Sequence, residues 1–213
     1  MIYSTLEQFC ADFCGDPDKT RFSAKYPGAI NRAQEQFAAD SKALFKDQSF
    51  TSTAGTATVD LPSDFTLEES VIYDGLPLKP VSRHTLAILY PGTDWTTLQG
   101  TPTHYMIDPE EASKVLRFIP IPQEAKSGSM RYYPLPAEVS AASDVILNAS
   151  ALMGQFHMGV AALAAWIVLL FESPTPEIVE KRRGLMKVYS DAVTKAVDTF
   201  GNTKSEPLRI RPK

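Results

Sequence analysis

The sequence predicts an α+β protein: N- and C-terminal helices form a bundle, a small antiparallel β domain is inserted between them, and an extended C-terminal arm follows. Three observations support this fold class. Residues 1–49 and 137–201 show helical periodicity, residues 50–136 are rich in strand and turn signals, and residues 202–213 hold too few apolar side chains to pack a core. A chain of 213 residues is long enough for such an arrangement.

Two helices are expected before residue 50. Ser4 and Glu7 have capping-box spacing, and an apolar stripe follows until Gly15 ends it. Cys10 and Cys14 fall on one face of this helix, where small core-facing side chains are a better interpretation than metal ligands. The second helix begins near a proline and carries one apolar stripe, so it covers another element, with Pro27 first and Ile30, Ala33, Phe37, Leu44 and Phe45 in the stripe.

The β insertion is marked by turn chemistry. Residues 50–60 are Thr-rich and predict a strand, and Asp74-Gly75 predicts a tight turn that joins two strands in a hairpin. Ser82 is placed to cap a short helix. Three further strands are expected, each bounded by turn residues: His104–Asp108, Val115–Ile119 and Ser129–Tyr133.

The most apolar stretch of the chain is Leu147–Phe171. Its charge-free run is shorter than the roughly 17–25 residues that span a bilayer, so the sequence favours a buried helix over a membrane segment. Its Ala- and Gly-rich surface suits close packing, either inside a bundle or between subunits. The helices at the two ends of the chain are expected to provide its cover.

A last helix is expected from Pro176 to Gly201, capped by Thr175. It carries a basic cluster with two interpretations: a solvated face partly paired with Glu177 and Glu180, or, in a ring, a channel lining that meets DNA phosphates. The cluster consists of Lys181, Arg182, Arg183 and Lys187.

Composition limits the function classes. A formal net charge of −4 and a pI near 5.4 argue against a protein whose whole surface binds nucleic acid, although a local basic patch is compatible with them. Acidic residues interrupt the first turns, so no secretory signal is expected and synthesis is expected in the cytoplasm. His84, His104 and His157 do not have metal-ligand or triad spacing, so we expect no enzyme, no metal and no cofactor. A small hydrolase using His104 or His157, and a DNA-binding module built on the last helix, stay as rivals.

Several phrases together resemble one family. They are Ile30–Gln34 in the second helix, Leu61–Phe65 before the sheet, Gly100–Tyr105, and Leu116–Pro122, followed by Tyr132-Tyr133 and the helix around His157. In this order they resemble the head-to-tail adaptor proteins of tailed bacteriophages, over roughly residues 25 to 172.

The resemblance implies a non-enzymatic structural protein of the virion neck, assembled in the host cytoplasm. It implies a homo-oligomeric ring, commonly a dodecamer, that docks beneath the portal protein, carries tail or nozzle proteins, and lets packaged DNA pass without sequence-specific binding. Another neck or tail-completion protein is the nearest alternative. The basic arm is expected to become ordered on the portal through Leu208, Arg209, Ile210, Arg211, Pro212 and Lys213.

Overall fold

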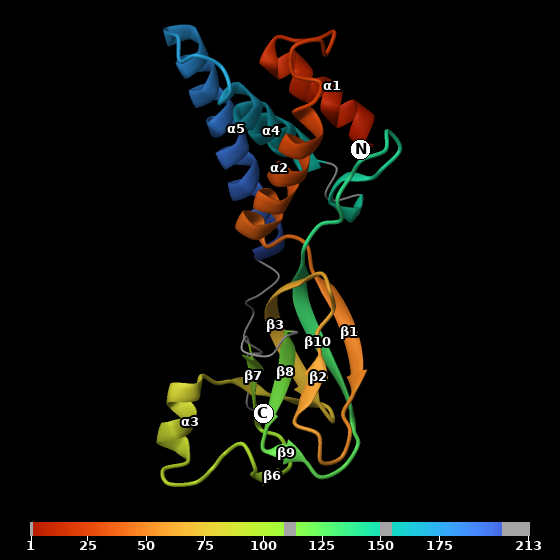
Figure 1. The fold of residues 1–213 in the computed structure, drawn as a ribbon, viewed down its shortest axis with the longest axis vertical. Coiled ribbons are helices and arrows are strands. Elements are labelled where there is room, and N and C mark those ends of the chain that lie inside the picture. Colours follow the sequence, from red (N-terminus) through yellow and green to blue (C-terminus); the bar gives the residue numbers. More distant parts are fainter. Residues whose placement is uncertain (1, 109–113, 150–154, 202–213) are drawn as a thin grey trace, which may run out of the picture. The chain divides into compact units, whose positions relative to one another are not determined.

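The computed structural model describes residues 2–108, 114–149 and 155–201. The described chain forms two compact units: a helical unit built from residues up to Leu44 and from Leu135 onward, and a β unit from Phe45 to Pro134 (Figure 1). The predicted α+β class is confirmed. The expected arm, residues 202–213, lies outside the described residues.

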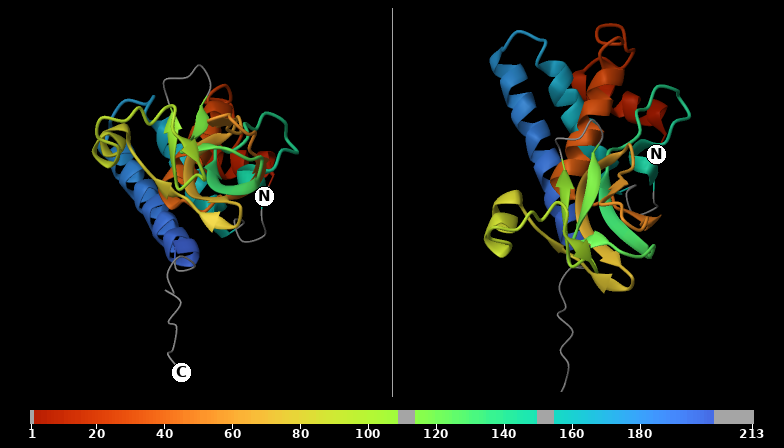
Figure 2. Two further views of the ribbon diagram at one scale, coloured as in Figure 1. Left: turned by 90° about the horizontal axis from the view of Figure 1, so that it is seen from below. Right: turned by 60° about the horizontal axis from the view of Figure 1, so that its bottom comes forward.

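The helical unit is organised around one central helix. Helix α4 (His157–Leu169) contacts α1 (Tyr3–Cys14), α2 (Tyr26–Ser41) and α5 (Pro176–Gly201). Figure 2 shows these helices grouped in two further views. The central position is possible because most of α4 is Ala, Gly and small aliphatic residues, which let three neighbours approach closely. Val160 to Ala165 are all buried.

Two predicted helix ends are wrong. Helix α1 begins at Tyr3 after Ile2, whose side chain makes no capping hydrogen bond, so Ser4 is inside the helix rather than at its start. Helix α2 ends at Ser41 because Lys42 adopts a left-handed conformation with φ 49°. Leu44 and Phe45 therefore do not continue its stripe, and Phe45 is 51% exposed.

The apolar stretch Leu147–Phe171 is not one helix. A 3₁₀ turn, η1 (Ile146–Ala149), includes Leu147 with φ 56°, residues 150–154 lie outside the described residues, and α4 starts only at His157. Its last residues are open to solvent, since Leu170 is 49% and Phe171 65% exposed. No helix in the described ranges has the length and apolar character needed to cross a membrane.

The β unit consists of two four-stranded sheets and one short strand pair. The first sheet has the order β1 (Lys46–Thr51), β10 (Ser127–Pro134), β3 (Phe65–Tyr73) and β4 (Leu76–Pro77). The second has the order β2 (Thr58–Asp60), β8 (Val115–Ile119), β7 (His104–Asp108) and β5 (Lys79–Pro80). Strands β6 (Gln99–Gly100) and β9 (Ile121–Pro122) form the pair, and α3 (Arg83–Leu89) follows β5.

Strand pairing is antiparallel except in two short places. Pairs β5–β7 and β6–β9 are parallel, which the expectation of a purely antiparallel sheet did not include. The first arises because the chain crosses from one sheet to the other at Leu78, whose N–H donates to the Val71 carbonyl while the next residue's N–H donates to Thr103. The core of the unit holds mainly aromatic and aliphatic residues, among them Tyr105, Leu116, Phe118 and Met130.

The turn predictions in the β unit are confirmed. Asp74 and Gly75 have φ of 48° and 77°, the left-handed pair that joins β3 to β4. The Ser82 side chain accepts a hydrogen bond from the Thr85 N–H at the start of α3. The single strand expected at residues 50–60 is instead divided between β1 and β2, with a turn at Gly55 between them.

Candidate interaction surfaces

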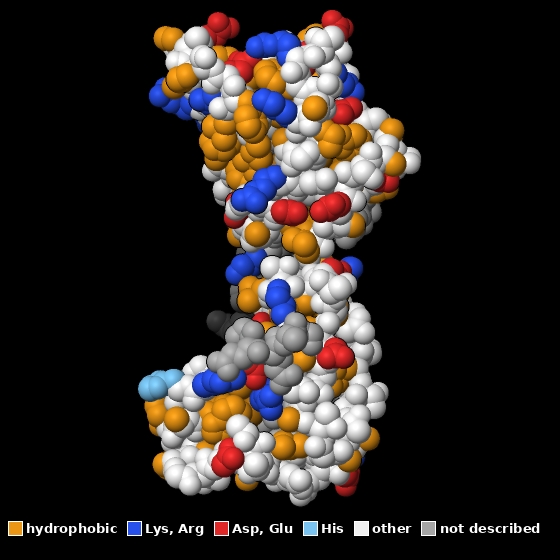
Figure 3. Space-filling view, viewed as in Figure 1, with side chains coloured by type: hydrophobic (Ala, Val, Ile, Leu, Met, Phe, Trp, Pro, Cys, Tyr) orange, Lys and Arg blue, Asp and Glu red, His pale blue; other side chains and the backbone are white. Residues whose placement is uncertain are grey.

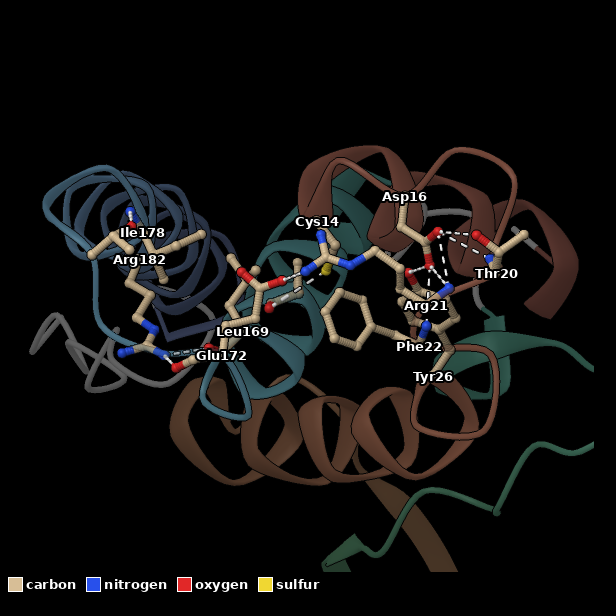
Figure 4. Close-up of polar contacts among 12 residues, drawn as sticks. Cys14, Asp16, Thr20, Arg21, Phe22, Tyr26, Leu169, Glu172, Ile178 and Arg182 are labelled. Atoms are coloured by element: carbon tan, nitrogen blue, oxygen red, sulfur yellow. Dashed lines mark hydrogen bonds and ion pairs between the residues drawn. The ribbon is translucent and has the colours of Figure 1, made fainter.

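The basic cluster of α5 does not form one surface. Arg182 lies against the end of α4, where its guanidinium donates to the carbonyls of Leu169 and Glu172 (Figure 4). The last carbonyls of a helix have no partner within the helix, and an arginine near that end can satisfy them. Arg182 is therefore engaged in holding α4 and α5 together, which the sequence spacing alone did not show.

The other three members of the cluster differ in their partners and exposure. Arg183 pairs with Glu180 at 2.7 Å, and both side chains are at least 70% exposed, as the solvated interpretation predicts. The ammonium of Lys181 is near the left-handed end of α1, since a Cβ at Gly15 would be 3.3 Å from it. Lys187 is exposed. Arg183 and Lys187, one turn apart on α5, are thus the exposed cations of the cluster, and Lys181 is only partly exposed.

A buried carboxylate orders the loop between α1 and α2. Asp16 accepts hydrogen bonds from the Thr20 N–H at 2.9 Å, the Phe22 N–H at 3.2 Å and the Tyr26 hydroxyl at 2.8 Å (Figure 4). Burial alone would raise the pKa of this carboxyl, but the bonds from Tyr26 and the loop backbone outweigh it and hold the pKa below its ordinary value. This loop is tied to the α4–α5 turn by an ion pair between Arg21 and Glu172.

The cysteines lie in the core as predicted. Cys10 and Cys14 are buried, and the Cys14 Sγ donates to the Ala165 carbonyl of α4 at 3.7 Å. Hydrogen bonding with Cys14, together with burial, raises the pKa of the Cys10 thiol. A raised thiol pKa disfavours the reactive thiolate at Cys10. Both side chains are buried, and the Cys14 contact with Ala165 places them where α1 packs on α4.

The histidines proposed for a hydrolase belong to different units. His157 is buried at the start of α4, whereas His104 lies in β7 and hydrogen-bonds the Thr103 hydroxyl at 2.9 Å. His84 is exposed on α3. Within the described ranges, no group of three or more His, Cys, Asp or Glu side chains is arranged to hold a metal ion.

The helical unit has an apolar groove of about 470 Å³, which we call the α2/α4/α5 groove. Its apolar floor is formed by the outer face of α4, with residues of α5 on one side and polar residues of α2 on the other. The full set is Arg32, Gln36, Asp40, Leu163, Trp166, Ile167, Leu170, Met186 and Tyr189. Figure 3 shows hydrophobic side chains gathered where α5 and α2 flank α4.

The sequence predicts that the apolar stretch packs closely, inside the bundle or between subunits, but does not show that one side of α4 borders an open groove. The described structure leaves Leu170 and Met186 49% and 36% exposed, and Trp166 is only partly buried. A contiguous apolar hollow with a polar rim marks a site of interaction with another molecule. One signal was present in the sequence: Met186 lies off the main apolar stripe of α5.

A helical unit with an inserted β unit and an open apolar groove defines a two-unit α+β scaffold suited to contacts with other proteins. A family model described as SU10 adaptor protein matches residues 1–205. The chain therefore belongs to the SU10 adaptor protein family, and the resemblance to phage head-to-tail adaptors is confirmed. No curated protein matches the chain.

Family membership makes the chain a structural adaptor protein of a phage, of a kind that interacts with portal and tail components. The residues expected to bind the portal cannot be placed within this fold. Leu208, Arg209, Ile210, Arg211, Pro212 and Lys213 lie outside the described residues, beyond the end of the family match.

Proposed function

We propose that this chain forms a homo-oligomeric ring, a dodecamer, at the neck of the virion, where it joins the portal protein to tail or nozzle proteins. The family match over residues 1–205 is the observation that carries this proposal. The open α2/α4/α5 groove adds support, because a ring subunit must bury apolar surface against its neighbours. Assembly takes place in the host cytoplasm, and the ring continues the DNA channel.

The C-terminal arm makes the portal contact in this proposal. Residues 202–213 carry four basic side chains against one acidic side chain, Glu206, so their net charge is 4 − 1 = +3. Apart from two prolines, their only apolar side chains are Leu208 and Ile210. Such a segment cannot form a core alone and gains order on a partner, at an entropic cost that the contacts must offset.

The DNA passing through the ring would meet exposed cations without sequence-specific binding. Arg183 and Lys187 are the exposed members of the basic cluster left for this role, with Lys181 partly exposed, because Arg182 is bonded to the end of α4. A stand-alone DNA-binding module has less support, since Arg183 is already paired with Glu180 and Arg182 is bonded to the end of α4. If the chain docks on a partner other than the portal protein, it is instead another neck or tail-completion protein.

The arm is tested with the full chain, a chain that ends at Gly201, and the portal protein of the same phage. We expect co-sedimentation with the portal for the full chain and its loss for the shortened chain, with the urea midpoint of both chains unchanged. Replacing Arg209 and Arg211 together with Gln should weaken binding, whereas Lys204→Gln serves as the control outside Leu208–Lys213. Portal binding by the shortened chain equal to that of the full chain would contradict the proposal.

A further inference from the structure

The floor of the α2/α4/α5 groove is one face of α4. Leu163, Trp166, Ile167 and Leu170 are spaced at i, i+3, i+4 and i+7, so they form a continuous strip along two turns. The remaining sides of α4 are covered by α1, α2 and α5. Leu163 is buried, Trp166 and Ile167 are partly exposed, and Leu170 is 49% exposed, so the strip opens toward the C-terminal end of α4. A second molecule bound there would complete the cover of α4.

Helix α2 separates this groove from the segment 135–147. The Asn31 side chain exchanges two hydrogen bonds with the Val139 backbone, at 3.1 and 2.9 Å, and Gln34 donates to the Ala137 carbonyl at 2.8 Å. The groove is lined instead by Arg32 and by the residues one and two turns later. Since successive helical side chains project about 100° apart, these two sets leave α2 on opposite flanks.

The flank opposite the groove carries an exposed apolar pair. Ile2 and Val145 form an isolated antiparallel bridge and are 44% and 48% exposed. The Tyr3 N–H donates to the Asp144 carbonyl at 2.8 Å, which fixes the pair to the start of α1. Figure 1 shows α5 and the N-terminus on different sides of the helical unit. A groove on one side and an exposed apolar pair on the other allow copies to associate head to tail and close into a ring.

The two flanks are also complementary in charge. Residues 132–180 contain no Lys or Arg, so Glu138 and Asp144 make the segment 135–147 acidic. On the groove side Arg32 is exposed, and the Asp40 carboxylate accepts a hydrogen bond from the Tyr189 hydroxyl. Among the described residues, neither Arg32 nor Glu138 has an ion-pair partner. Each of these two charges is therefore available to a second molecule.

We infer that the α2/α4/α5 groove receives a second copy of this chain, whose Ile2–Val145 pair covers Trp166 and Met186 while its Glu138 meets Arg32. The inference rests on the proposed ring and names the contact between neighbouring subunits. It assigns the apolar surface of α4 to assembly and leaves the arm free for the portal.

The first test uses Trp166 as a reporter within the groove. The chain has two tryptophans, Trp95 in the β unit and Trp166, so a Trp95→Phe chain reports on the groove alone. Acrylamide quenching and sedimentation are measured together over a range of concentrations, with and without the portal protein of the same phage. We expect quenching of Trp166 to fall by about half or more in every species that contains neighbouring copies, because buried surface excludes the quencher.

The second test places matched substitutions on α5. Met186 lines the groove and Val188 does not, yet their exposures are similar at 36% and 42%. We expect Met186→Glu to weaken association of the copies by about tenfold or more, and Val188→Glu to leave it unchanged. Urea unfolding of each chain verifies that both fold. Equal assembly by the two variants would overturn the inference.

The third test identifies the occupant by exchanging charges. Arg32→Glu and Glu138→Arg are each expected to weaken association by roughly three- to tenfold, and the double variant to restore it, because the pair is re-formed between copies. If the double variant does not restore association, or if acrylamide quenches Trp166 equally in associated and single copies, this contact is overturned but the ring is not. A chain that stays monomeric both alone and beside its portal overturns the ring proposal itself.

Discussion

Gly159 of α4 and Ala192 of α5 meet so closely that a Cβ placed on Gly159 would lie 2.4 Å from the Cβ of Ala192. Carbon atoms that are not bonded to one another do not approach this closely, so α4 and α5 can pack as they do only with glycine at residue 159. The contact joins the apolar central helix to the helix that carries Met186 and Tyr189, and it therefore helps to set one wall of the groove.

Gly159→Ala is expected to lower the free energy of unfolding by about 1–3 kcal/mol, the usual cost of overpacking a core. Gly184→Ala is the matched control on α5, because a Cβ there meets nothing within 4 Å. Alanine is the better helix former, so this control should raise the free energy of unfolding by about 0.5–1 kcal/mol. Urea unfolding followed by circular dichroism measures both; equal effects would refute the close contact.

Asp16→Asn tests the loop network. Asparagine cannot accept all the hydrogen bonds that the Asp16 carboxylate receives, so the helical unit should lose about 1–3 kcal/mol of stability near pH 7. Asp18→Asn, an exposed neighbour, should change stability by less than about 0.5 kcal/mol. Urea unfolding of the two variants against the unsubstituted chain gives the comparison.

The same carboxylate predicts a pH dependence of stability. Its pKa in the folded chain is below the ordinary value of 3.8, so its contribution is complete above 3.8 and is lost as the pH falls through the folded pKa. The difference in unfolding free energy between the unsubstituted chain and Asp16→Asn should therefore stay constant above the ordinary value and shrink below it. A difference that does not vary with pH would contradict the assigned hydrogen bonds.

Arg182→Ala separates a structural from a DNA-contacting role. Loss of the bonds to the Leu169 and Glu172 carbonyls should lower the free energy of unfolding by about 1–3 kcal/mol. Its neighbour Arg183 makes only an exposed ion pair with Glu180, so Arg183→Ala should cost less than about 1 kcal/mol. If the two variants are equally stable, Arg182 does not hold the end of α4.

Gly128→Ala should destabilise the β unit selectively. A Cβ at Gly128 would lie 2.3 Å from the Phe50 ring and 2.6 Å from the Ile72 carbonyl, so strands β1, β10 and β3 would have to shift. A cost of about 1–3 kcal/mol is expected. Gly100→Ala, where the nearest atoms are at 3.5 Å, should cost less than about 1 kcal/mol. Trp95 fluorescence in a Trp166→Phe chain follows the β unit during unfolding.

Local chemistry was enough to predict several strands and turns of the β unit, but not its division into two sheets. Strands β7 and β8 have the predicted bounds, and the hairpin turn at Asp74-Gly75 and the Ser82 cap are as expected. Each depends on residues close in sequence whose backbone preferences are strong. The crossing at Leu78 that makes β5 parallel to β7 depends on long-range pairing, so no nearby residue signals it.

In the helical unit, contacts between residues far apart in the sequence decide features that local patterns do not predict. A run of apolar residues predicts close packing, but it does not show which residues stay open, such as Leu170, which lines the groove. Arg182 was grouped with its sequence neighbours because its partners, Leu169 at the end of α4 and Glu172 in the turn after it, are ten or more residues away. Both features require knowing how α4 and α5 pack.

The central claim, that this adaptor assembles as a ring on the portal, is tested most directly by measuring the mass of the complex between the full chain and the portal protein of its phage. Native mass spectrometry, followed by imaging of the same particles, gives the number of copies and their symmetry. The proposal predicts a closed ring, a dodecamer, on one face of the portal. A chain that remains monomeric in the presence of its portal would contradict it.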